Sequence, residues 1–332
     1  MSNTYSDGTS NTTKTLAPPS HSSYITRVLE QYGMKDCNPV KTPALKTQQV
    51  KTDNEETEQD FPYREAVGSL LYVANSCRPD IAQATHHAAR FVNQPSKEHV
   101  HSVKRILRYL KGTINVGITF KNCDNYQLHG YADADFASST QDARSTTGYV
   151  FITSGPISWR SRRQQITALS TTEAEINALA EAAKEATWLA TMLSEIGLIP
   201  HDYTVKMFED NAGCLALVHG KRTPARTRHL AVRIGYLRDL IDSKRIDVIK
   251  CATDDMVADP FTKPLGHVEF TRKMVGLLTM TTSDQNGRDP TNDDDIQSST
   301  ETYTDDDQIE EDNQQGSGRA HHPLTHSLEG EC

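Results

Sequence analysis

The sequence lacks any long apolar run and any paired cysteine motif. No apolar stretch approaches the roughly 20 residues that a membrane-spanning helix needs, and the stretch MSNTYSDGTSNTTKTLAPPS has no apolar segment typical of a signal peptide. The six cysteines are scattered without a CxxC spacing, which excludes the common zinc motifs and a disulfide framework. We therefore expect an intracellular protein that has reduced thiols and no membrane partner.

Negative charge is concentrated at one end of the chain. The formal charge of the 332 residues is −9, but residues 281–332 hold 14 acidic residues against two arginines, which is −12. Residues 1–280 are therefore mildly basic, at about +3, and nucleic acid is not excluded as a partner. The acidic tail and the Ser- and Thr-rich residues 1–22 cannot bury enough apolar surface to order themselves, so both are predicted to be disordered.

Residues 23–119 are predicted to form a small helical block. Apolar residues recur at helical spacing in residues 63–76, a second helix is expected to start at Pro79, and a third covers residues 96–112. The third helix carries lysines and arginines beside its apolar stripe. This basic surface is either a solvated helix face or a phosphate-facing surface, and composition does not separate the two.

In residues 120–280 the spacing of apolar residues changes from that of helices to that of β-strands. Five strand-like runs are expected, at residues 126–135, 147–154, 157–161, 204–210 and 245–250. Three strands followed by a helix and further strand and helix units predict a mixed α/β sheet with flanking helices. The longest helix begins with a capping-box pattern between Ser170 and Glu173, has an apolar stripe that reaches Ile196, and ends at Gly197.

Four acidic residues fall at the ends of these predicted elements. Asp133 ends the first strand, and Asp210 ends the fourth. Glu175 lies in the first turn of the long helix, and Asp259 precedes Pro260 at a short helix start. Each acid alone has a structural explanation, but four in the order D, E, D, D favour a site, because sites in α/β sheets gather where strand ends and helix starts converge.

The composition of this predicted site indicates its chemistry. Carboxylates without histidine or thiol partners are hard oxygen ligands, suited to Mg²⁺ or Mn²⁺ rather than zinc. We therefore predict two Mg²⁺ ions, for which Mn²⁺ can substitute, and no small-molecule cofactor. Two ions held in this way can activate a water and stabilise the attacking and leaving oxygens of phosphodiester cleavage.

From about residue 23 to residue 278, the chain resembles the C-terminal end of the Pol polyprotein of copia-type LTR retrotransposons. Six strings resemble, in sequence order, the ribonuclease H domain of that family: GYADADFAS, RSTTGYVF, ISWRSRRQQITALSTTEAE, EDNAGCLAL, RTRHLAVRIGYLRDLI and VADPFTKPL. Three earlier strings resemble the thumb-like and connecting helices that follow the polymerase palm in the family: SSYITRVLEQYGMKDCNPVKTP, PYREAVGSLLYVANSCRPDIAQA and VKRILRYLKGT. The resemblance implies a ribonuclease H-like five-stranded sheet in residues 120–280, preceded by a thumb-like block in residues 23–119.

The resemblance also implies a role for each acid. Asp133 would bridge two metal ions, Glu175 and Asp210 would hold the leaving-group side, and Asp259 would hold the ion of the nucleophilic water. Glu175 is preferred to Glu173 because AEINAL matches the catalytic helix of the family. Asn177 in that string, like Phe136 and Ser138 after the first strand, departs from the residues that are usual in the family, but none of these departures removes a metal ligand.

The implied substrate is the RNA strand of an RNA–DNA hybrid, cut to leave a 3′-hydroxyl and a 5′-phosphate. Recognition would depend on 2′-hydroxyl and backbone contacts. The candidates for phosphate contacts flank the first strands, where a solvated rim is the alternative, and are Arg144, Ser145, Arg162, Arg163 and Gln165. Other retroelement Pol products would be partners, in a cytoplasmic particle or in the nucleus.

One departure from the family and two alternatives bear on this interpretation. The polymerase palm of the family carries two adjacent aspartates, and YADAD does not supply them because Asp133 and Asp135 are not adjacent; a truncated Pol without the palm and without reverse transcriptase activity is therefore expected. The first alternative, an integrase, shares the sheet and the metal chemistry, but its acids run D, D, E. The second alternative is an inactive or domesticated remnant that at most binds nucleic acid, and the sequence leaves it open.

Overall fold

A computed structural model describes residues 19–46, 60–120, 125–139, 142–222 and 224–280. All of them belong to one of the two units of the chain, the unit that covers residues 1–284. The tails that were predicted to be disordered lie outside the described residues, except that a helix begins at Pro19. None of the described helices is long and apolar enough to span a membrane.

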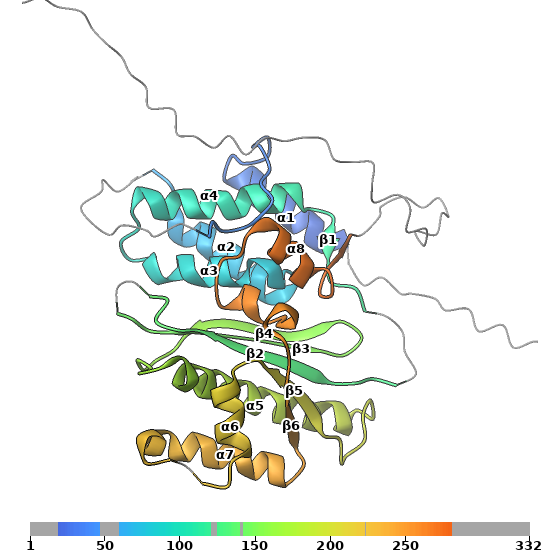
Figure 1. Cartoon of the computed structure of the whole chain (residues 1–332). Helices are drawn as coiled ribbons and strands as arrows, with labels where there is room; N and C mark the ends of the chain where they lie inside the picture. The colour runs from blue at the N-terminus through green and yellow to red at the C-terminus, as the bar shows by residue number, and fades with distance from the viewer. Residues whose placement is uncertain (1–18, 47–59, 121–124, 140–141, 223, 281–332) are drawn as a thin grey trace, which may run out of the picture. The chain divides into compact units, whose positions relative to one another are not determined.

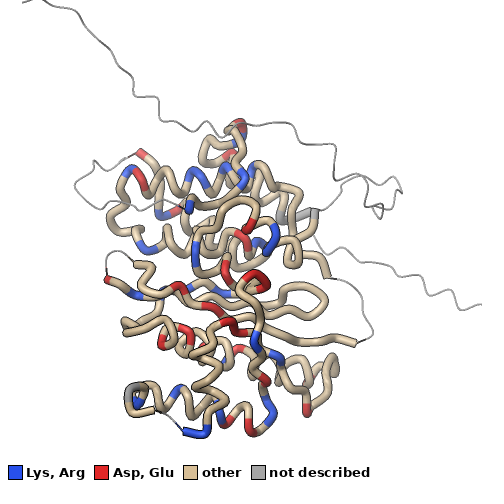
Figure 2. Tube along the Cα trace, in the orientation of Figure 1, with Lys and Arg blue, Asp and Glu red and all other residues tan. Residues whose placement is uncertain are grey.

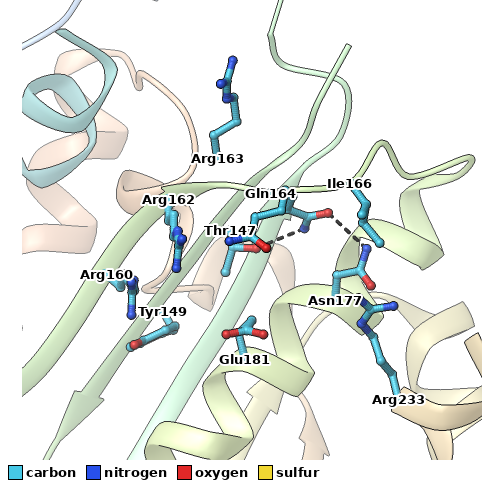
Figure 3. Close-up of a pocket in the computed structure, with 11 residues that line it drawn as sticks. Thr147, Tyr149, Arg160, Arg162, Arg163, Gln164, Ile166, Asn177, Glu181 and Arg233 are labelled. Atoms are coloured by element: carbon cyan, nitrogen blue, oxygen red, sulfur yellow. Dashed lines mark hydrogen bonds between the residues drawn. The ribbon is translucent and has the colours of Figure 1, made fainter. Parts of the chain in front are cut away.

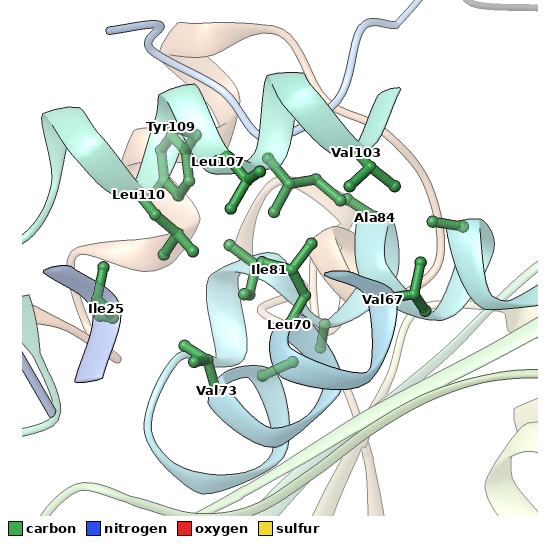
Figure 4. Close-up of a cluster of buried hydrophobic side chains, with 14 of the residues drawn as sticks. Ile25, Val67, Leu70, Val73, Ile81, Ala84, Val103, Leu107, Tyr109 and Leu110 are labelled. Carbon is green, nitrogen blue, oxygen red and sulfur yellow. The ribbon is translucent and has the colours of Figure 1, made fainter. Parts of the chain in front are cut away.

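The helical block contains short and long helices packed on one another (Figure 1). Its elements are α1 (Pro19–Gln31), α2 (Tyr63–Ser76), η1 (Pro79–Ile81), α3 (Ala82–Ala88), η2 (Ala89–Phe91) and α4 (Lys97–Gly112). The helix predicted from Pro79 is divided into η1, α3 and η2, and Ile81 at the first junction has a ψ of 1°, outside the α-helical range. Figure 4 shows apolar side chains of α1, α2 and α4 converging on Ile81.

A buried ion pair joins the ends of α2 and α4. The guanidinium of Arg78 lies 2.7 Å from the carboxylate of Asp80, and it also donates to the carbonyl of Thr113 at 2.9 Å. The hydroxyl of Tyr109 donates to the same carboxylate at 2.7 Å. Because every partner is satisfied, this charged pair is tolerated in the core and fixes the path of the chain between the two helices.

Most of the basic side chains of α4 are engaged within the helical block. Figure 2 shows Lys and Arg along this helix. Lys104 lies over the ring of Phe61, Arg105 donates to the hydroxyl of Thr42, and Arg108 donates to the carbonyl of Asn38. These contacts favour the solvated, structural interpretation of the basic surface that the sequence left open.

The second block is built on a five-stranded sheet. Its strands are β2 (His129–Asp135), β3 (Thr146–Ile152), β4 (Pro156–Arg163), β5 (Val205–Glu209) and β6 (Ile246–Lys250), in the order β4-β3-β2-β5-β6. The strands β2, β3 and β4 are antiparallel neighbours, whereas β5 is parallel to both β2 and β6. This order and these directions confirm the predicted mixed sheet of the ribonuclease H-like fold.

The two faces of the sheet are covered by different parts of the chain (Figure 1). One face packs against α5 (Thr171–Glu195), α6 (Ala212–His219) and α7 (Ala231–Asp242), and its core includes Tyr149 and Phe151 of β3. The alternate residue Val150 points to the other face, into the core of the helical block. The indole N–H of Trp159 donates to the carbonyl of Ala74 at 2.8 Å across this second interface.

The C-terminal part of the described chain returns to the helical block. After β6 come η4 (Thr253–Asp255), η5 (Asp259–Phe261), α8 (His267–Met274) and β7 (Thr279–Met280), and β7 pairs antiparallel with β1 (Val116–Gly117). The side chains of Phe261, Leu265 and Phe270 belong to the same core as α2 and α4. The division into residues 23–119 and 120–280 remains a prediction, and the two parts share this core.

The start of α5 differs from the predicted capping box in one bond. The hydroxyl of Ser170 accepts from the N–H of Glu173 at 3.2 Å, as predicted. The carboxylate of Glu173, however, accepts from the N–H of Leu169 rather than that of Ser170. At the other end, Gly197 has a φ of +76° as expected for a helix stop, but Ile196 is exposed because the helix ends before it.

Candidate metal centre

Three of the four predicted acids meet at the C-terminal edge of β2 and β5. One carboxylate oxygen of each of Asp133, Glu175 and Asp210 lies within 4.8 Å of the others. The register explains the meeting of the two aspartates: Tyr131 pairs with Phe208 in parallel strands, so the residues two positions further on emerge at the same edge. Glu175 reaches this edge from the beginning of α5.

Burial makes this cluster electrostatically unusual. Asp133 is 4% exposed and Glu175 is 6% exposed, and Oε2 of Glu175 has no hydrogen-bond partner among the described residues. Burial raises the pKa of Asp133 to about 7, although the ammonium of Lys263 opposes the shift. Burial, and then the neighbouring carboxylates of Glu209 and Asp133, raise the pKa of Glu175 well above its ordinary value.

A fifth acid, Glu209, was missed in the sequence. It is fully buried at the end of β5, where Oε1 accepts from the N–H of Asn211 at 3.0 Å and Oε2 has no partner among the described residues. Burial raises its pKa to about 8 against the effect of that N–H, and Asp133 adds to the rise. The signal was the strand period, because Val205, Met207 and Glu209 share the face that packs on α5.

The cluster has the properties of a site for a divalent ion with oxygen ligands. Its members are acids that lie close together, and within the part of the chain that the structure describes only Lys263 pairs with one of them, at 4.0 Å from Asp133. The unpartnered oxygens of Glu175 and Glu209 are buried where solvent does not satisfy them. Carboxylate oxygens suit Mg²⁺ or Mn²⁺, and a bound cation would relieve the repulsion between the acids.

The fourth predicted acid, Asp259, lies beside Asp133 but outside the three-acid cluster. The hydroxyl of Thr262 lies 2.6 Å from Oδ2 of Asp133 and 2.9 Å from the carbonyl of Asp259, so its one proton is shared between the two acceptors and links the two residues. Each oxygen of Asp259 lies 2.7 Å from a lysine ammonium, Oδ1 from Lys263 and Oδ2 from Lys273. Burial would raise the pKa of Asp259, but these two ammonium groups outweigh burial and lower it.

Comparison with known proteins places this site in a family. Over 268 residues, 78% of this chain, the sequence is 40% identical to the retrovirus-related Pol polyprotein from transposon TNT 1-94 of Nicotiana tabacum. Over 249 residues, 74% of this chain, it is 35% identical to the retrovirus-related Pol polyprotein from transposon RE1 of Arabidopsis thaliana. The chain belongs to the copia-type retrovirus-related Pol polyproteins. It spans only a fifth or less of these two relatives, 20% and 17% of their lengths.

Family models and solved structures were also compared with this Pol segment. No family model matches the chain. Among solved structures, it is similar to LC11-RNase H1 isolated from compost, with 14% identity and a TM-score of 0.32, over 41% of this chain and 92% of that chain. The fold of the Pol segment is defined by its strand order β4-β3-β2-β5-β6, with antiparallel β4, β3 and β2 and parallel β2, β5 and β6.

A pocket of about 150 Å³ lies in this Pol segment between β4 and α5 (Figure 3). Among the predicted phosphate contacts, Arg162, Arg163 and Gln165 line it, and Arg160 and Arg233 add positive charge. The remaining lining residues are Thr147, Tyr149, Gln164, Ile166, Asn177 and Glu181. Figure 3 shows Arg160 and Arg162 on the β4 side, Arg233 on the opposite side, and Arg163 extending away from the others.

Buried amides form the floor of this pocket. The amide N–H groups of Gln164 donate to the hydroxyl of Thr147 and to the carbonyl of Ala174, at 3.0 and 2.9 Å. Its carbonyl oxygen accepts from the amide of Asn177 at 3.2 Å. Asn177, a departure from the family pattern, therefore holds β4 against α5, two residues from Glu175.

The other two predicted phosphate contacts lie in the turn before β3. The guanidinium of Arg144 lies 3.2 Å from the carboxylate of Asp142, which also pairs with Arg163 at 3.0 Å. Ser145 is fully buried, and its hydroxyl accepts from the N–H of Ala137 at 3.2 Å. In this conformation Ser145 fixes the turn after β2, and its contact with phosphate stays a prediction.

Proposed function

We propose that this Pol segment is a ribonuclease H that hydrolyses the RNA strand of an RNA–DNA hybrid. The proposal depends on one observation above all: oxygens of Asp133, Glu175 and Asp210 lie within 4.8 Å of one another, although these acids come from three different elements. The buried Oε2 of Glu175, which has no partner among the described residues, supports a ligand at this position. Acids so arranged suit Mg²⁺, with Mn²⁺ as a substitute.

Each acid has a proposed role. Asp133, Glu175 and Asp210 would hold one ion, and Asp133 and Asp259 would hold a second. Divalent ions bound there supply the charge that activates a water and stabilises the attacking and leaving oxygens of the phosphodiester. The hydroxyl of Thr262 fixes the orientation of Asp133, the residue common to both positions. The products would carry a 3′-hydroxyl and a 5′-phosphate.

Recognition of the hybrid is proposed to depend on its backbone. Arg162, Arg163 and Gln165 offer donors at a basic pocket, a surface suited to phosphate and 2′-hydroxyl groups rather than base edges. We propose no small-molecule cofactor besides the ions. Partners would be other products of the Pol polyprotein, in a cytoplasmic particle or in the nucleus.

A cleavage assay with the full chain tests the proposal. We expect the wild-type protein to cut the labelled RNA strand of a hybrid in Mg²⁺, and Asp133→Asn or Glu175→Gln to abolish cutting. The matched control is Asp247→Asn, which alters an exposed acid of β6 and should leave the rate unchanged. A wild-type protein that leaves hybrids intact in both Mg²⁺ and Mn²⁺ would contradict the proposal.

A second candidate function is binding of hybrids without cleavage. It is favoured by one observation: both oxygens of Asp259 are already paired with lysines, which competes with metal binding at that residue. Fluorescence anisotropy with a labelled hybrid separates the two functions. Binding that persists with no product in either metal would support the remnant, whereas binding with cleavage supports the enzyme.

A further inference from the structure

The two lysines that neutralise Asp259 are held in different ways. The ammonium of Lys273 donates to three backbone carbonyls, those of Thr253, Asp254 and Met256, at 2.9, 3.2 and 3.0 Å. A lysine has three N–H donors, and these carbonyls together with the carboxylate of Asp259 at 2.7 Å engage all of them, while the side chain is 2% exposed. Lys273 is therefore a fixed part of the core beneath Asp259.

Lys263 has none of these restraints. Its side chain is 36% exposed, and among the described residues its ammonium contacts only carboxylates, Asp259 at 2.7 Å and Asp133 at 4.0 Å. A lysine side chain is a flexible four-carbon stem that carries a compact charge. Lys263 can therefore turn towards solvent without breaking a backbone hydrogen bond, whereas Lys273 cannot.

The ammonium of Lys263 lies close to two carboxylates, 2.7 Å from Asp259 and 4.0 Å from Asp133. The proposed function assigns a divalent ion to these same two carboxylates. An ammonium and a divalent cation repel each other and compete for the same oxygens, so the two cannot share this position. In the cluster of Asp133, Glu175 and Asp210, by contrast, no lysine is paired with Glu175 or Asp210 among the described residues.

We propose that Lys263 is a tethered counter-ion, which fills the Asp133–Asp259 position in the free protein and is exchanged for a divalent ion when a nucleic-acid phosphate draws it away. This inference rests on the proposed function. It divides the site into two halves: the three-acid half accepts an ion at any time, and the Asp259 half accepts one only when Lys263 has moved. Lys263 is thus a positioning residue that couples substrate binding to completion of the metal site.

The number of bound Mn²⁺ ions tests the proposal without any measurement of activity. Free Mn²⁺ is measured by paramagnetic resonance during titration of the full chain. We expect the wild-type protein to bind one ion tightly and a second only weakly. For Lys263→Met we expect the dissociation constant of the second ion to fall about tenfold or more. Lys263→Arg keeps the charge and should behave as the wild type. Lys206→Met removes an exposed lysine of β5 and is the matched control.

A second arm adds a hybrid that cannot be cut, with 2′-O-methyl groups on the RNA strand. We expect this hybrid to raise the count of the wild-type protein from one ion to two and to leave Lys263→Met at two. Thermal unfolding of each variant without metal confirms that it is folded.

The outcomes separate this inference from the proposed function. Two ions of equal affinity on the free wild-type protein, or one ion on Lys263→Met, would overturn the role of Lys263 and leave the three-acid site intact. A hybrid that does not raise the count would overturn the exchange. No bound ion on any protein would overturn both the inference and the proposed function.

Discussion

The two faces of the five-stranded sheet contribute to the site in different ways. On the face covered by α5, that helix supplies Glu175, and Asp210 follows the strand β5. The core of this face is formed by residues of the sheet block itself. The face covered by the helical block carries Asp259, whose neighbour Phe261 packs in the core of α2 and α4. Asp133 in β2 is close to the acids of both halves: it clusters with Glu175 and Asp210, and the hydroxyl of Thr262 links it to Asp259.

This difference assigns a role to the helical block. The block supplies none of the clustered acids, yet it forms the core in which Phe261, Leu265 and Phe270 are buried. These three residues hold η5 and α8, the elements that carry Asp259 and Lys273. One half of the site therefore depends on packing against residues more than a hundred positions earlier in the chain.

The largest effect is expected for Lys273→Met. The substitution leaves the carboxylate of Asp259 with one fewer counter-charge and deprives three backbone carbonyls, of which only that of Met256 is in a buried contact, of their donor. Breaking a buried pair in this way costs about 3–5 kcal/mol of unfolding free energy. Urea unfolding measures the loss, with Lys250→Met at an exposed position as the control, for which a change within about 0.5 kcal/mol is expected. An unchanged midpoint would show that Asp259 does not need Lys273.

A pair of phenylalanines compares the two faces directly. Phe261 and Phe151 are both fully buried, one on each face, and truncation of either to alanine should cost about 3–5 kcal/mol. Phe261→Ala should also reduce cleavage in conditions where the variant is folded, because it loosens the turn that carries Asp259. Phe151→Ala should lower stability alone. Equal loss of cleavage in both folded variants would remove the distinction between the faces.

The buried acids should make the metal-free protein less stable as the pH rises. Asp133 and Glu209 have pKa values of about 7 and about 8 in the folded state, above their ordinary values. The folded state therefore retains protons that the unfolded state has released, so the stability that these two acids contribute is fully present below the ordinary carboxylate range and is lost as pH rises through about 7 and about 8. A scan of melting temperature against pH measures this slope.

Mg²⁺ should reverse that loss. An ion that binds only the folded state at a hundred times its dissociation constant adds about 2.7 kcal/mol of stability. The gain should be larger at pH 8 than at pH 5, since protons compete with the ion for the same oxygens. Glu175→Gln should reduce the gain. A rise in melting temperature that is equal at both pH values would argue against binding at the raised-pKa acids.

The sequence could predict the parts of the site that depend on local signals. Strand period, the Ser170 cap and the Gly197 stop are local, so β2, β5 and α5 could be predicted to within two residues at the ends that carry the acids: Asp133 lies two residues before the end of β2, and Asp210 follows β5. The partners of Asp259 could not be predicted in the same way. Lys273 reaches it through the packing of α8 on the helical block, and no local pattern records that contact.

Two further differences have the same tertiary origin. The helix predicted from Pro79 is broken because Asp80 turns into the buried pair with Arg78, which outweighs the local helical propensity. Glu209 lay next to Asp210 in the sequence, and only the direction of its side chain, towards α5, distinguishes the two acids.

The smallest effect is expected at the basic surfaces of the two blocks. Each lysine or arginine that contacts phosphate contributes about 0.9 to the slope of log affinity against log salt concentration. Arg162→Gln, at the pocket beside α5, should therefore lower that slope by about 0.9 for hybrid binding, with little change in stability. Lys97→Gln removes a cation at the start of α4, the helix whose Arg105 and Arg108 are engaged within the helical block, and should leave the slope unchanged. Salt titrations of hybrid binding measure both variants. A lower slope for Lys97→Gln would make α4 a second contact surface for the backbone, so that both faces of the sheet, and not only the α5 face, would carry part of the hybrid.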